Sequence, residues 1–124
     1  MKNCTVEKII EIYENSGKIL YDTIMSSDYK KFNKEVSKLT KYFKLFEQQP
    51  EFVHQCIDRL LESSNVVIKT KAAAYCLALN YRVPYAESVL QEIADNPDNK
   101  MFGFDAKMTL QVWKQNGYLK IYQK

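Results

Sequence analysis

The sequence predicts an all-α fold of about six helices. Apolar residues recur every three or four positions along the chain, and only three glycines and three prolines interrupt its 124 residues. Valine, isoleucine and threonine never gather into alternating runs bounded by turns, as strands would require. The length suits one core that needs no disulfide or metal, so we predict a single helical domain over residues 1–124.

Cap residues and prolines divide the apolar pattern into six segments. Thr5, Asp28 and Asn65 can cap helix N-termini, and two further segments carry a proline in the first turn. Gly117 is well placed to end the last segment as a C-cap. The predicted helices cover about residues 6–25, 29–46, 50–63, 66–80, 84–95 and 101–116.

The fourth segment is apolar on nearly all sides through residues 72–79. Such a helix belongs in the middle of a fold, where neighbouring helices cover it. Its apolar positions also align with those of the sixth segment at a shift of about 34 residues, which lies in the range of helical-pair repeats. We therefore predict a short HEAT-like, right-handed stack of helical pairs.

The first two segments each have one apolar stripe that should face the core. Gly17 lies on the first stripe, where the missing side chain would let a second helix approach closely, so we predict a helix crossing there. Tyr21 continues the first stripe, and Tyr29 begins the second. Both tyrosines are therefore expected to face inward.

Cysteine usage and the N-terminal residues favour the cytoplasm. Cys4, Cys56 and Cys76 form an odd set without C-x-x-C spacing, so we expect neither a disulfide framework nor a zinc site. Glu7 and Glu11 interrupt the stretch that a signal peptide would need to be apolar, and no apolar run reaches membrane-spanning length. We expect a cytoplasmic protein with no membrane partner.

The residue types that usually carry catalysis are few. His54 is the single histidine and lies within one helical turn of Glu51 and Asp58, which resembles half of a carboxylate-bridged metal site. No second half-site is present, so a solvated polar face explains the three residues better. Cys56 and Cys76 lie in apolar stripes, where cysteine acts as a small hydrophobe. We therefore expect no enzymatic activity, no cofactor and no metal.

One helix carries a ridge of lysines. In the segment 29–46 the lysines fall opposite the apolar stripe, and a basic ridge of this kind could follow a phosphate backbone. A solvated face is the alternative, because arginine and interleaved aromatics are mostly missing there. The residues of this alternative nucleic-acid surface are Lys30, Lys34, Lys38 and Lys41.

Acidic residues and tyrosines predict surfaces for a protein partner. The net charge of +3 is modest, but acids gather on the first helix and around the loop between the fifth and sixth. Acidic patches can occupy the phosphate-binding cleft of a nuclease, and tyrosine is favoured at interfaces. The candidate partner-binding residues are Glu7, Glu11, Glu14, Tyr81, Arg82, Asp95, Asp98, Asp105, Tyr118 and Tyr122.

Three segments carry a resemblance to a known family. Residues 69–73 and 102–110 are similar to the helix openings of small bacterial HEAT-like proteins, and residues 28–33 resemble the junction of their N-terminal helix pair. Such proteins resemble immunity proteins encoded beside bacterial toxins, including toxins of contact-dependent growth inhibition systems that are often RNases, some of the EndoU type. The resemblance implies a monomer that binds a toxin domain as a heterodimer and occludes it without catalysis.

Overall fold

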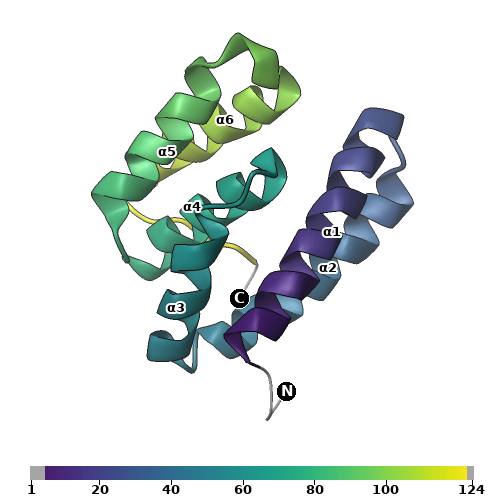
Figure 1. Ribbon diagram of the computed structural model, residues 1–124. Helices are drawn as coiled ribbons and strands as arrows, with labels where there is room; N and C mark the ends of the chain where they lie inside the picture. Colours follow the sequence, from purple (N-terminus) through teal and green to yellow (C-terminus); the bar gives the residue numbers. More distant parts are fainter. Residues whose placement is uncertain (1–4, 123–124) are drawn as a thin grey trace.

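The computed structural model describes residues 5–122, and this part of the chain forms six α-helices and one short 3₁₀-helix (Figure 1). The elements are α1 (Val6–Ser26), α2 (Tyr29–Phe46), α3 (Pro50–Leu60), α4 (Val66–Leu79), α5 (Val83–Asp95), η1 (Pro97–Asn99) and α6 (Met101–Asn116). The predicted all-α class is confirmed, whereas HEAT-like stacking stays a prediction.

Local capping explains where the helices begin and end. The Thr5 hydroxyl accepts a hydrogen bond from the amide of Lys8 at 3.1 Å, and the Asp28 carboxylate caps α2 in the same way. Gly117 ends α6 with a φ of 74°, in the left-handed region that favours glycine. Helix α3 ends earlier than predicted, at Leu60, because the amides of Glu62 and Ser63 bond to carbonyls three positions back and tighten the chain into a turn.

Helix α4 occupies the centre of the fold, as its apolar sequence predicts. It contacts α1, α3, α5 and α6, and in Figure 1 it lies between the α1–α2 pair and the α5–α6 pair. Its first buried residue, Ile68, and the buried Ala72, Ala73, Cys76 and Leu77 point to different sides of the helix. Covering helices on several sides therefore supply the burial that makes this helix stable.

Gly17 marks the crossing of α1 and α4. A Cβ atom at position 17 would lie 2.4 Å from Cγ1 of Ile68, which is fully buried. Only a residue without a side chain allows α1 and α4 to pack this closely. The crossing predicted from the sequence is confirmed.

A pair of buried tyrosines joins three helices in the core. The hydroxyls of Tyr13 on α1 and Tyr75 on α4 lie 2.9 Å apart, and the Tyr13 hydroxyl donates to the carbonyl of Leu39 on α2 at 3.4 Å. The ring of Tyr75 packs against Phe43, with ring centres 4.6 Å apart. Burial raises the pKa of both phenols, so both remain neutral and serve as hydrogen-bonding groups.

The prediction that Tyr21 and Tyr29 face inward is wrong. Tyr21 is 40% exposed, because Leu20 takes the buried position and the Tyr21 ring stacks at the surface on Phe102 of α6, with ring centres 4.9 Å apart. Tyr29 is 73% exposed, since it is the first residue of α2 and side chains there point back toward the helix N-terminus, beyond the end of the packed face.

We predict that Tyr13→Phe and Tyr75→Phe each lower the free energy of unfolding by about 1–2 kcal/mol, because each removes the buried hydrogen bond between the two hydroxyls. The double variant should lose less than the sum of the two, since both remove the same hydrogen bond. Urea denaturation measures the three values, with the exposed Tyr29→Phe as the matched control. Strictly additive losses would contradict the interaction between the two hydroxyls.

Candidate protein-interaction site

The turn between α4 and α5 meets α3 in a small network of polar side chains. The Asp58 carboxylate on α3 accepts a hydrogen bond from the Tyr81 hydroxyl at 2.7 Å and from Nη1 of Arg82 at 2.9 Å. One carboxylate oxygen thus holds two residues of the turn. The network fixes the direction of both side chains at the surface.

Aromatic rings extend this network on both sides. The His54 ring stacks on Tyr81 with ring centres 3.8 Å apart and planes 4° from parallel, and the Arg82 guanidinium lies 4.4 Å from the centre of the Tyr85 ring. Stacking and cation–π contact both restrict the motion of the side chains concerned. We call His54, Asp58, Tyr81, Arg82 and Tyr85 the Asp58 cluster.

The backbone of the turn is held in an uncommon conformation. Asn80 and Arg82 have φ values of 55° and 52°, in the left-handed region that residues other than glycine and asparagine rarely adopt. The Tyr81 amide donates to the carbonyl of Cys76 at 2.8 Å, which ties the turn to the end of α4. Arginine in this conformation costs about 1 kcal/mol or more and is found where the surrounding structure enforces it, often at functional sites.

The charge states in the Asp58 cluster follow from its contacts. Burial and the hydrogen bond to Asp58 raise the pKa of Tyr81 to about 12, and the Asp58 carboxylate raises the pKa of Arg82. At neutral pH the phenol is therefore neutral and the guanidinium is charged. The cluster presents ordered tyrosine and arginine side chains, the residue types that dominate binding energy at protein interfaces.

Helix α3 connects the Asp58 cluster to the acidic residues of α1. Arg59 of α3, which follows Asp58 in the sequence, forms an ion pair with Glu7 of α1 at 3.4 Å. Glu11 and Glu14 follow at the helical spacing that keeps them on the Glu7 face of α1. Half of the predicted partner-binding residues, Glu7, Glu11, Glu14, Tyr81 and Arg82, thus lie on adjoining elements.

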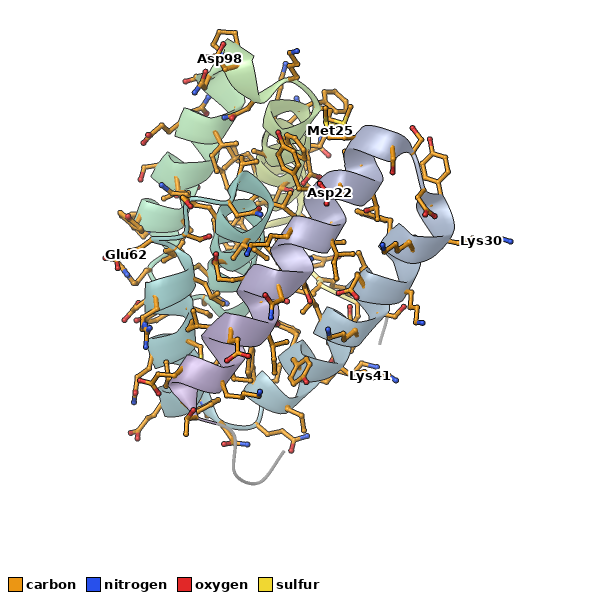
Figure 2. The ribbon with its side chains drawn as sticks, turned by 45° about the vertical axis from the view of Figure 1, so that its right-hand side comes forward. Asp22, Met25, Lys30, Lys41, Glu62 and Asp98 are labelled. Atoms are coloured by element: carbon orange, nitrogen blue, oxygen red, sulfur yellow. The ribbon has the colours of Figure 1, made fainter. Side chains whose placement is uncertain are left out.

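The other predicted residues lie elsewhere. Asp98, on η1, is at the far end of the molecule from the first turns of α1 (Figure 2), and Asp95 accepts a hydrogen bond from Gln91. Asp105 lines a cleft beside α4, and Tyr118 is exposed on the C-terminal tail. Tyr122 donates to the Glu47 carboxylate. The structure does not bring this second group together with the Asp58 cluster.

The predicted lysine ridge is exposed along α2. In Figure 2 Lys30 and Lys41 point away from the rest of the molecule, on the opposite side from Glu62 in the turn after α3. Lys34 is also exposed, and Lys38 lies 3.7 Å from the Glu35 carboxylate on the same helix. The ridge and the Asp58 cluster therefore belong to different faces.

The partner-binding residues predicted from the sequence include Tyr81 and Arg82 but not His54 and Asp58, which contact them. His54 and Asp58 drew attention only as part of a metal half-site, and within residues 5–122 no group of three or more histidine, cysteine or carboxylate side chains could hold a metal ion. The two cysteines of the described range, Cys56 and Cys76, are buried as expected, while Cys4 lies outside the described residues.

Comparison with family models, with curated proteins and with solved structures gives no match for this chain. None of the helices within residues 5–122 combines the length and apolar character that crossing a membrane requires. The candidate site therefore rests on the geometry described above.

We predict that Arg82→Gly leaves the free energy of unfolding within about 0.5 kcal/mol of the native value. Glycine relieves the left-handed strain, and this gain offsets the loss of an exposed ion pair, which is worth less than about 1 kcal/mol. The matched control is Arg59→Gly, which also removes an exposed ion pair but places glycine in a helix, and should cost about 1 kcal/mol. Equal losses in thermal or urea denaturation would contradict strain at Arg82.

Proposed function

We propose that this chain is an immunity protein: it binds a cognate bacterial toxin domain in the cytoplasm and neutralises it without catalysis. The toxin we infer is a nuclease of a contact-dependent growth inhibition system, with an EndoU-type RNase as one form. The resemblance of residues 28–33, 69–73 and 102–110 to small HEAT-like immunity proteins motivates the proposal. The Asp58 cluster supports it.

The observation that carries the proposal is the exposed Arg82, held at once by an ion pair, a cation–π contact and a strained backbone. A side chain that is ordered before binding loses little conformational entropy when a partner covers it. Tyrosine and arginine anchors of this kind contribute most of the energy at tight interfaces. The Arg82 side chain is exposed and makes its ion pair with Asp58 and its cation–π contact with Tyr85, so it is available to a partner.

The acidic residues of α1 suit the kind of partner that we infer. A nuclease binds phosphate with basic side chains, and Glu7, Glu11 and Glu14 would meet such a surface next to the Asp58 cluster. Complementary charge speeds association, which an immunity protein needs because the toxin acts as soon as it arrives. We therefore place the toxin across α1, α3 and the α4–α5 turn.

The test first identifies the binding partner and then measures whether this chain protects cells from growth arrest. Affinity capture from the native host identifies a large secreted protein encoded beside this chain, and its C-terminal domain is then expressed with and without this chain. We expect Tyr81→Ala with Arg82→Ala to weaken binding by about 2 kcal/mol, roughly 30-fold in Kd, and to abolish protection from growth arrest. Lys34→Ala, on the opposite face, is the control and should protect fully.

Two charge reversals locate the acidic part of the interface. Glu7→Lys with Glu11→Lys should reduce protection, whereas Asp95→Lys with Asp98→Lys should not, because Asp95 and Asp98 lie at or beyond the opposite end of the 13-residue helix α5 from Arg82. The opposite result would move the interface to the α5–α6 end. Protection by every variant would refute the proposed face, and failure of the native chain to bind any neighbouring toxin would refute the function.

A second candidate function uses the lysine ridge of α2. Its four lysines are all exposed on one helix, so a nucleic-acid backbone could lie along them. In that case RNA or DNA should bind with an affinity that falls steeply with salt, and Lys34→Glu with Lys38→Glu and Lys41→Glu should abolish the binding. Fluorescence anisotropy with labelled RNA and DNA measures it, and no binding at low salt would exclude this candidate.

A further inference from the structure

A cleft separates the α1–α2 pair from α4, α6 and the C-terminal tail. Its volume is about 250 Å³, and a second hollow of about 230 Å³ adjoins it and shares Ile24, Phe32, Val67, Thr70 and Asp105 as walls. Aliphatic and aromatic side chains from α1, α2, α4 and the tail make up most of the lining. The two hollows together form an apolar trough of the size that small ligands occupy.

One charged side chain in this trough lacks a close partner. Lys71 on α4 is half-buried in the wall of the cleft, and in the part of the chain that the structure describes no carboxylate oxygen lies within 4.0 Å of its ammonium group. Burial lowers the pKa of Lys71, while the charge of Asp105 on α6 raises it. A buried ammonium group without an ion pair is poorly stabilised, and an anion beside it would supply the missing contact.

The charges around the cleft favour one anionic group. Lys71 and Lys120 line it as cations, and Asp105 is the single carboxylate in its wall. Burial raises the pKa of Asp105, whereas Lys71 lowers it. Thr70 and Thr109 donate their hydroxyl hydrogens to backbone carbonyls. Their hydroxyl groups therefore have no hydrogen left to donate to an anion. The two lysines and one aspartate give the lining one excess positive charge, which a ligand with one negative charge would balance.

We propose that the cleft binds an amphiphilic carboxylate of the fatty-acid type, with its carboxylate on the Lys71 ammonium and its chain along Ile24, Phe32 and Val67. An unbranched acyl chain suits the apolar lining, and a single carboxylate suits the excess of one positive charge in that lining. The site is separate from the Asp58 cluster, and the proposal does not depend on the immunity function.

Calorimetric titration with decanoate below its micelle concentration tests the head group. Lys71→Gln should weaken decanoate binding by about tenfold or more, because a charge-assisted hydrogen bond contributes roughly 1.5–3 kcal/mol and tenfold in Kd is 1.4 kcal/mol. Decanol, with the same chain and no charge, should bind weakly and equally to both forms. Lys107→Gln is the matched control, since Lys107 is an exposed lysine of α6 outside the cleft.

A second variant tests the place of binding. Ala74 lines the cleft from α4 and is only partly buried, so Ala74→Leu should fill part of the volume and remove the binding of both decanoate and decanol. Circular dichroism shows whether this variant keeps its helices. Ala74→Ser is the control, because serine is much smaller than leucine and this variant should still bind both ligands. The proposal is overturned if native protein binds no decanoate, if Lys71→Gln binds it as tightly as native protein, or if folded Ala74→Leu binds it unchanged.

Discussion

Helix α4 is stable only where other helices cover it, and this constraint organises the whole molecule. Alanine at its contact positions lets four helices approach, and Gly17 allows the close approach of α1 at Ile68. The Tyr13–Tyr75 hydrogen bond then fixes α1 in rotation as well as in position, because two buried hydroxyls must meet. The remaining helices attach to a framework that α1, α2 and α4 define.

The candidate interaction site follows from the way this central helix ends. After α4 the chain must turn sharply to begin α5, and the two left-handed residues of that turn direct Tyr81 and Arg82 toward α3. Asp58 fixes them from a helix that packs on α4. Because the turn is tied to the core on one side and to α3 on the other, its exposed side chains are ordered even though they lie at the surface.

The sequence predicts most of what depends on local chemistry. Caps such as Thr5 and Gly117 set helix ends within a few residues, and the apolar run of α4 reveals its central position. Features that join distant segments were not predictable in the same way. Asp58 and Tyr81 are 23 positions apart, and Tyr21 of α1 stacks on Phe102 of α6, so no periodicity within one helix signals either contact. The cleft around Lys71 likewise exists only once α1, α2, α4, α6 and the C-terminal tail have assembled.

The sequence separation of the core contacts also bears on the order of folding. Helices α5 and α6 are neighbours along the chain and can pair after closing a short loop, whereas Tyr13 must find a partner 62 positions away. Gly17 weakens α1 in isolation, so this helix gains most of its stability on docking. We therefore expect the C-terminal helices to pair early and α1 to dock late. The acidic residues of α1 then reach the Asp58 cluster only in the fully folded chain.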